Sequence, residues 1–259
     1  MLRIVLGALA AVLMLGQPTQ AAELQVVPIR LGISNVFLLK AVRPVLVDAG
    51  AKNDMPALEA ALGTQGVKLE ELAAVIVTHA HSDHAGLAAE IKRRSGATLV
   101  LGEGDVGMAH DGHNDELKPT NLMARILKRF FIDPSYDAFK PDVQVQGEID
   151  LTRFGIAGRA VQMPGHTAGS LVVLLDDGRA FVGDMMLGGW MGGAVFATQA
   201  GEHYFQADLA RNRANIAALL RLPLHLKTFY LGHGGPVSRA SVLSGFDLSE
   251  PVALGQAAK

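Results

Sequence analysis

The stretch Thr78–Gly86, which reads THAHSDHAG, decides the fold expected of this chain. It holds three histidines and one aspartate within six residues, and the apolar run AAVIV lies immediately before it. Such a run is typical of a buried strand. His79 and His81 are two positions apart, so in extended chain their side chains point to the same side. Asp83 and His84 follow where the chain turns toward a helix, so they can address a second position close to the first.

These residue types indicate a metal site at the end of the strand. Neutral imidazole and carboxylate groups are suitable ligands for zinc and for related divalent ions. Gathering so many ionisable groups in one place is costly unless a cation offsets them. The sequence therefore predicts that His79, His81, Asp83 and His84 bind metal.

Three later strand ends repeat the pattern of an apolar run, a glycine and a ligand type. His166 lies in MPGHTAGS, Asp184 ends VGD, and His233 lies in LGHGGP. The glycines allow sharp turns and a close approach of the backbone. Each pattern is weak alone, but together they predict that these side chains join the first group.

The remaining sequence indicates an α/β fold in one domain, within a chain of 259 residues of which 49% are hydrophobic and 19% charged. Short apolar runs alternate with helical patterns, and residues 103–143 form a less regular insertion over one edge, where binding loops and lids often lie. We expect strands at 36–40, 44–50, 73–79, 97–103, 149–156, 159–165, 170–177, 179–184 and 227–233, and helices at 55–62, 69–72, 85–94, 123–131 and 205–222.

The first 22 residues are predicted to be a signal peptide. They contain one cation, Arg3, then the apolar run Ile4–Leu15, Pro18 and small residues. The apolar run is shorter than the about 20 residues of a membrane span, although an uncleaved anchor is the alternative. We expect cleavage after Ala21 or Ala22, and a mature domain, residues 23–259, that is periplasmic or secreted without a membrane anchor.

Charge and cysteine content restrict the possible partners. The net charge is −2 without a basic block, so we expect a small-molecule substrate and no nucleic acid. The sequence has no cysteine, which excludes a disulfide, a lipid-attachment site at the cleavage point and a cysteine nucleophile. It does not indicate the oligomeric state.

The order of the motifs HxHxDH, GHTxGS, GD and GHGGP resembles the metallo-β-lactamase superfamily. VLVDAG, which contains Asp48, is similar to the first motif of that family. The resemblance extends from about Gln25 to Pro236. It implies an αββα sandwich, in which two mixed sheets lie face to face, helices cover the outside, and the metal site lies at one sheet edge.

The resemblance also implies a complete site for two zinc ions per chain, with iron or manganese as alternatives. Asp48 would orient the HxHxDH loop from outside the site. The ligands implied for the first metal are His79, His81 and His166, those for the second are Asp83, His84 and His233, and Asp184 would bridge the two.

These features predict an exported hydrolase in which a hydroxide between two zinc ions attacks an ester-like, thioester, lactone or amide bond. Asp83 is the candidate that carries a proton to the leaving atom, and Asp184 is the other catalytic candidate. No GxSxG motif is present, so a serine hydrolase is not supported.

Three alternatives stay open at this point. Export is compatible with a periplasmic β-lactamase, although a bridging aspartate resembles glyoxalase II and lactonases instead. The tail, residues 234–259, is too short for the glutathione-binding helical domain of glyoxalase II. A mononuclear iron enzyme that oxidises persulfides would hold about one iron instead of two zinc ions. A metal-binding or sensing module would hold metal without turnover.

A few further residues are candidates for substrate contact. Trp190, in GGWMGGAVF, is predicted either to contact an apolar acyl group or to pack over the core. Lactonases often carry a tyrosine soon after the bridging aspartate, and the nearest one here is Tyr204. His110 and His113 fit a solvated loop, with a substrate channel or a surface ion as alternatives.

Overall fold

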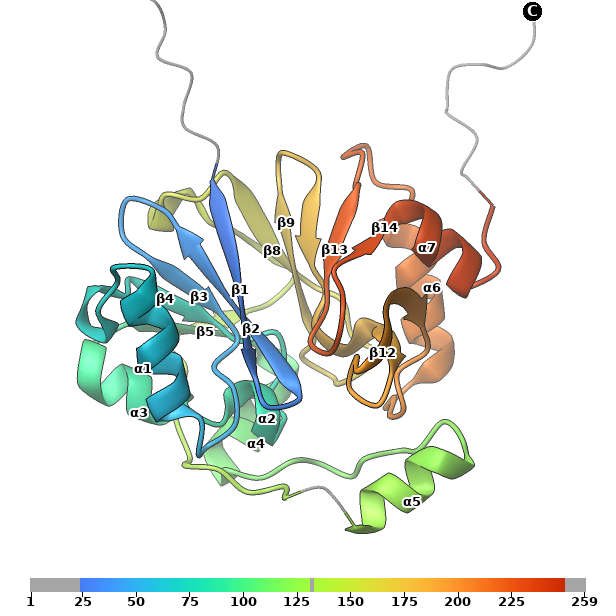
Figure 1. The fold of residues 1–259 in the computed structure, drawn as a ribbon, viewed down its shortest axis with the longest axis horizontal. Helices are drawn as coiled ribbons and strands as arrows, with labels where there is room; N and C mark the ends of the chain where they lie inside the picture. The colour runs from blue at the N-terminus through green and yellow to red at the C-terminus, as the bar shows by residue number, and fades with distance from the viewer. Residues whose placement is uncertain (1–23, 131–132, 250–259) are drawn as a thin grey trace, which may run out of the picture.

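The computed structural model describes residues 24–130 and 133–249, which form two six-stranded sheets and a separate two-stranded one (Figure 1). The predicted signal peptide, residues 1–22, lies outside the described residues. Within the described part, none of the helices combines the length and the apolar character that crossing a membrane requires.

The first sheet is mixed, because β1, β2 and β3 pair antiparallel and β3 to β6 pair parallel. Every residue of β3 and β4 is buried, as expected for parallel strands that are covered on both faces. In spatial order its strands are β1 (Gln25–Leu31), β2 (Ser34–Lys40), β3 (Val45–Val47), β4 (Ala74–Ile76), β5 (Thr98–Gly102) and β6 (Val143–Val145).

The second sheet is also mixed, with β10 and β13 parallel and its other pairs antiparallel. Beside it, β11 (Leu187–Trp190) and β12 (Val195–Gly201) form a hairpin. In spatial order the strands of the second sheet are β14 (Val237–Ser238), β13 (Thr228–Tyr230), β10 (Arg179–Phe181), β9 (Leu171–Leu175), β8 (Gly158–Gln162) and β7 (Glu148–Asp150).

Three clusters of apolar side chains separate four layers, which are helices, a sheet, a second sheet and helices. Side chains from both sheets, among them Phe37, Val47, Val173 and Phe181, form the cluster between the sheets. The outer face of the first sheet packs on α1 (Met55–Thr64) and α3 (Ala88–Ser95), and that of the second on α6 (Leu209–Leu219) and α7 (Arg239–Gly245) (Figure 1). The predicted αββα sandwich is confirmed.

Two sequence-based element predictions were wrong in part, and several strands were not predicted. The strand expected over 149–156 ends after β7, because Asp150 accepts a hydrogen bond from the Thr152 N–H at 2.6 Å and starts the 3-10 helix η3 (Thr152–Phe154). The helix expected from 205 begins only at Leu209, where the Asp208 side chain accepts from the Arg211 N–H. The strands that were not predicted are β1, β6, β11, β12 and β14.

The helix expected over 85–94 is divided in two. The chain forms α2 (Ser82–Ala85) first, and α3 begins after Gly86 and Leu87. A Cβ at Gly86 would lie 2.4 Å from the backbone nitrogen of Lys52, so the short α2 packs directly on a neighbouring loop. Asp83 and His84 therefore lie inside a helical turn and not before one.

The connection between β5 and β6 occupies the region predicted as an insertion. It contains η2 (Glu103–Asp105), α4 (Val106–Asp111) and α5 (Leu122–Phe130), and it runs below the lower ends of both sheets in Figure 1. We call residues 114–130 the strap. Its Thr120 N–H donates to the Tyr204 carbonyl at 2.9 Å, and its Lys118 carbonyl accepts from Gln206 at 3.0 Å. These bonds hold the strap against the segment before α6.

Candidate metal centre

The structure gathers all seven predicted ligands at one edge of the sandwich, although they come from both halves of the chain. They follow strand ends in each sheet: His79 and His81 come after β4, Asp83 and His84 lie in α2, His166 lies between β8 and β9, Asp184 lies in η4 (Gly183–Met185) after β10, and His233 lies between β13 and β14.

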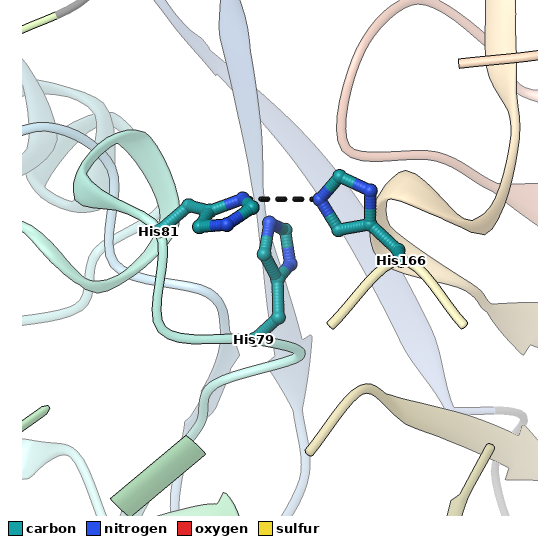
Figure 2. Close-up of side chains that lie close together, drawn as sticks. All are labelled: His79, His81 and His166. Carbon is teal, nitrogen blue, oxygen red and sulfur yellow. Dashed lines mark hydrogen bonds between the residues drawn. The ribbon is translucent and has the colours of Figure 1, made fainter. Parts of the chain in front are cut away.

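Three imidazoles form the first group (Figure 2). The Nδ1 atom of His81 lies 3.0 Å from the Nε2 atom of His166, and the ring of His79 stands nearly perpendicular to both. The three rings are at most 5% exposed. Each offers a nitrogen within 4.8 Å of the others, which is the arrangement of three ligands around one cation.

Asp83, His84 and His233 form the second group. The Asp83 Oδ2 atom lies 3.2 Å from the His233 Nε2 atom and 3.7 Å from the His84 Nε2 atom. The two Nε2 atoms are 3.4 Å apart. The Asp83 side chain is 28% exposed whereas the two histidines are buried, so Asp83 is the member of this group that solvent reaches.

Asp184 lies between the two groups. Its Oδ2 atom faces five imidazoles, and its side chain is only 3% exposed. The Oδ2 distances are 3.8 Å to His79 Nε2, 3.5 Å to His84 Nε2, 3.7 Å to His166 Nε2, 3.2 Å to His203 Nε2 and 3.3 Å to His233 Nε2. A carboxylate in this place can serve both groups.

Hydrogen bonds on the far side of three of the rings fix which of their nitrogens faces the centre. The Nδ1–H of His166 donates to the Phe205 carbonyl at 2.9 Å, and that of His233 to the Ile33 carbonyl at 2.8 Å. The Nδ1–H of His84 donates to Asp48 Oδ2 at 3.0 Å. Neutral imidazoles held this way point the Nε2 lone pair inward, as metal ligands do.

Asp48 reaches a second ligand through Thr78. The Thr78 N–H and hydroxyl donate to the two Asp48 oxygens at 2.7 and 3.0 Å, and the same hydroxyl oxygen lies 3.1 Å from His79 Nδ1. Asp48 has a φ of 65°, a left-handed conformation that aspartate tolerates better than most residues. The residue predicted to orient the HxHxDH loop therefore contacts that loop at three points.

The arrangement fits divalent cations. Within the described residues, the buried His79 Nε2 and Asp184 Oδ1 atoms have no hydrogen-bond partner. Burying such atoms unpaired is costly, as is pointing several nitrogen lone pairs at one another across about 3 Å. A bound cation removes both costs, the unpaired buried atoms and the facing lone pairs, because it accepts electron pairs from every atom that faces it. The donor set of imidazoles and carboxylates suits zinc, iron or manganese.

Comparison with known sequences supports this reading of the site. The sequence model described as the metallo-beta-lactamase superfamily matches residues 29–233, a span that includes all seven predicted ligands. The chain belongs to this superfamily.

Relatives within the superfamily are distant. The Bacillus subtilis protein named "Probable metallo-hydrolase YqjP" is 24% identical over 240 residues, covering 83% of this chain and 72% of that protein. The hydroxyacylglutathione hydrolase of Shewanella pealeana is 24% identical over 139 residues, covering 52% of this chain and 40% of that enzyme. The crystal structure of TTHA1623 in a di-iron-bound form superposes with a TM-score of 0.59 at 22% identity, covering 85% of this chain and 98% of that one.

The direction of the pKa shift divides four histidines of this centre into two classes. Burial, and then neighbouring histidines, lower the pKa values of His79 and His166, which therefore stay neutral. Burial opposes charging of His233 too, but Asp184 and Asp83 outweigh it and raise its pKa to about 10. The pKa of His84 is raised against the same burial by Asp184, Asp83 and Asp48. Protons and cations therefore compete for the nitrogens of His84 and His233.

Asp105, which sequence reasoning missed, joins the two loops that carry the first group. Its fully buried carboxylate accepts hydrogen bonds from the Ala80 N–H at 3.0 Å, the Thr167 hydroxyl at 2.8 Å and the Gly169 N–H at 2.6 Å. Burial raises its pKa, while these three bonds favour the charged form. Ala80 lies between two predicted ligands, so Asp105 links the HxHxDH motif to the GHTxGS motif.

The backbone comes very close to the centre at Gly232. A Cβ there would lie 2.1 Å from Asp184 Oδ1 and 2.6 Å from His84 Cε1. Only glycine allows the strand end to pass behind these two side chains. This explains in physical terms why a glycine precedes the His233 ligand.

His203 was not predicted as part of the site, but it lies inside it. Its ring is 6% exposed, and its Nε2 is the imidazole nitrogen nearest to Asp184 Oδ2. No motif marks it in the sequence, because it follows β12 at no recognisable ligand spacing. His110, by contrast, has an 85% exposed side chain and contacts Asp111, and His113 contacts the Asn114 carbonyl, so neither joins the cluster.

The two substrate-contact candidates lie on different elements. The ring of Tyr204 packs with strap residues, among them Leu117 and Leu127, and its centroid lies 6.1 Å from that of the His203 ring. Trp190 is 61% exposed at the end of β11, on the hairpin that contacts the His233 loop. Substrate contact stays a prediction for both residues.

Proposed function

We propose that this protein is a hydrolase that uses two divalent cations, with zinc as the first choice, to cleave an ester, thioester, lactone or amide bond of a small molecule. The observation that carries the proposal is the convergence of five imidazole nitrogens on one buried oxygen of Asp184. One of these nitrogens, His79 Nε2, and the other Asp184 oxygen, Oδ1, have no hydrogen-bond partner among the described residues. Membership of the metallo-β-lactamase superfamily and the names of the two curated relatives support it.

The side chains have separate roles in this proposal. Two cations bound here would lower the pKa of a shared water from about 15.7 to near 7 and polarise the bond under attack. Asp184 would be a ligand of both cations. His79, His81 and His166 would hold one cation, and Asp83, His84 and His233 the other.

Asp83 is the group placed to move the proton. It is the exposed member of its group, so a substrate can approach it. Burial raises its pKa, but His84 and His233 outweigh burial and hold that pKa below its ordinary value. The carboxylate is therefore ionised at neutral pH, and it can accept the proton of an attacking water and pass it to the leaving atom.

An apolar hairpin beside the centre suggests the kind of substituent that the substrate carries. We use this name for Trp190, Met191, Val195 and Phe196, which are 41–74% exposed at the end of β11 and the start of β12. The Gly188 N–H of this hairpin donates to the His233 carbonyl at 2.9 Å. A substrate with its reacting carbonyl at the cations would place an apolar acyl group on this surface.

The test begins with the mature chain, residues 23–259, freed of metal and reloaded with zinc, manganese or iron. Each form is assayed on acyl-homoserine lactones, glutathione thioesters, β-lactams and phosphodiesters, with metal content measured in parallel. We expect about two zinc ions per chain and turnover of acyl substrates that is lost on chelation. Full turnover by verified metal-free protein would contradict the proposal, and about one iron per chain would favour the persulfide-oxidising alternative.

We also propose that the protein works outside the cytoplasm. The support is the sequence pattern of residues 1–22. Protein recovered from the periplasmic fraction or the medium should begin at Ala22 or Glu23 when its N-terminus is sequenced. Recovery of the chain in the cytoplasm with its first 22 residues intact would contradict this.

A further inference from the structure

His203 is a sixth imidazole in a centre for which the superfamily resemblance supplies five. Its Nε2 atom lies 3.2 Å from Asp184 Oδ2, closer than the Nε2 atom of any of the other four imidazoles that face this oxygen through Nε2. Its ring stacks on His233 at 5.6 Å with an interplanar angle of 19° and meets His166 edge-on at 4.9 Å. The side chain therefore lies over Asp184, between the two ligand groups.

The surroundings of His203 are those of a metal ligand. Its Nδ1 atom lies 3.2 Å from the Phe205 carbonyl, the oxygen that also accepts from His166 Nδ1 at 2.9 Å. A carbonyl has two lone pairs, so one backbone oxygen can hold both rings with Nε2 facing inward. With this tautomer, the His203 lone pair points at the Asp184 carboxylate, which is repulsive unless a cation lies between them.

A hydrogen-bond role is the competing explanation. The Phe205 N–H also lies 3.3 Å from His203 Nδ1. If Nδ1 accepted that bond, the proton would be on Nε2, and His203 would donate to Asp184 instead of binding metal. Against this, His166, Asp184 and His203 each offer a ligand atom within 4.8 Å of the other two, the same criterion that the two predicted groups meet.

We propose that His203 is a metal ligand of this centre, and that its Nε2 coordinates the cation that His166 and Asp184 also hold. This rests on the metal centre of the proposed function but not on the bond that is cleaved. One cation would then have five protein donors, namely His79, His81, His166, His203 and Asp184, and the other cation would have four. The two positions would differ in affinity, and the cation with fewer donors would be the one left open for substrate.

Two substitutions separate a ligand from a hydrogen-bond donor. In His203→Gln the amide can still donate to Asp184 but is a poor ligand for zinc. In His203→Asp a carboxylate can bind a cation but cannot donate, and it repels Asp184 when no cation is present. His110→Gln is the matched control, because His110 is exposed and lies outside the centre. Circular dichroism checks that each variant is folded.

The readouts are metal affinity, measured by competition with a chromogenic chelator, and the ¹H NMR spectrum of the Co²⁺-loaded protein. Each coordinated imidazole keeps one exchangeable N–H, which the paramagnetic ion shifts out of the normal range. We expect six such signals in the wild type and in His110→Gln, and five in His203→Gln. Loss of an outer partner of a metal site costs about 10–100-fold in affinity, so we expect the loss of a direct ligand in His203→Gln to weaken binding of one cation by at least about 100-fold, and His203→Asp to retain most of the affinity.

Each outcome has one meaning. If His203→Gln keeps the wild-type affinity and signal number, His203 is not a ligand, and the inference falls while the proposed function stands. If the wild type itself binds no divalent cation, the proposed function falls with it. If His203→Asp does not fold, His203→Gln decides alone, because the glutamine amide keeps the polarity of the site and can donate to Asp184 but is a poor ligand for zinc.

Discussion

Replacing Asp105 by asparagine should loosen the metal centre without touching any ligand. The wild-type carboxylate accepts three hydrogen bonds in a fully buried position, from Ala80, Thr167 and Gly169. An asparagine has the same size but only one oxygen. Whichever way the amide is turned, its NH₂ group faces a backbone N–H, since Gly169 lies on one side and Ala80 on the other.

The magnitude follows from those contacts. Losing one hydrogen bond to a charged acceptor costs about 1.5–3 kcal/mol, and a buried donor left facing another donor costs about 1–3 kcal/mol more. Removing a buried charge recovers part of this, since burial disfavours the ionised form. We expect a net loss of about 2–4 kcal/mol in the free energy of unfolding. For a chain of this size that is roughly 5–15 °C in melting temperature.

The effect on metal binding is the more specific readout. Ala80 lies between His79 and His81, and Thr167 follows His166, so the loops that hold the first group lose their link. We expect Asp105→Asn to weaken cation binding about 10–100-fold, the usual effect of removing an outer partner of a metal site. Affinity is measured by chelator competition, and stability by urea unfolding of the metal-free protein.

Asp142→Asn is the matched control. Asp142 also accepts a backbone hydrogen bond, from Leu99 at 2.8 Å, and pairs with Lys92, but its side chain is 40% exposed and it lies away from the ligands. We expect a loss near 1 kcal/mol and unchanged metal affinity. If Asp105→Asn behaved like this control, the assignment of Asp105 as the link between the two loops would be refuted.

Three further predictions follow from the site. In metal-free protein, the raised pKa of His233 stabilises the fold by an amount on the order of a few kcal/mol, which is fully present below about pH 6.5 and is lost as the pH rises toward about 10. The melting temperature of the chelated protein should therefore fall over that range. A flat or rising profile would contradict the raised pKa of His233. Gly232→Ala should prevent binding of at least one cation while leaving a folded chain, because its Cβ would overlap Asp184 Oδ1, as metal analysis and circular dichroism can show; full metal content would disprove the close approach. Trp190→Ala should raise KM for acyl substrates several-fold with little change in kcat, whereas an unchanged KM would remove the apolar hairpin from the substrate site.

The ligand residues were predictable because their chemistry is local in sequence. The run from His79 to His84 needs no distant partner to be recognised, since an alternating pair after a buried strand already points two imidazoles the same way. The glycine-flanked His166, Asp184 and His233 are similar patterns at later strand ends. The mixed sheets of the sandwich followed from the family resemblance of these motifs.

Asp48 was predicted from the family resemblance, but two other residues of the site, Asp105 and His203, were not predictable, because their roles depend on contacts between distant segments. Asp105 lies at the start of an irregular connection, where one aspartate looks like any surface residue. Its three donors come from two other loops. His203 lies before a helix that begins later than its apolar pattern predicts, and in the irregular segment between them the Phe205 carbonyl contacts the rings of both His203 and His166.

The sequence by itself determined which residue types meet a cation and the order in which they occur, because ligand chemistry and strand alternation act over a few residues. The tertiary structure alone decided that a buried carboxylate links two of the ligand loops and that a further imidazole lies over Asp184. Those facts depend on packing between the two sheets, which brings together atoms from segments that no local pattern connects.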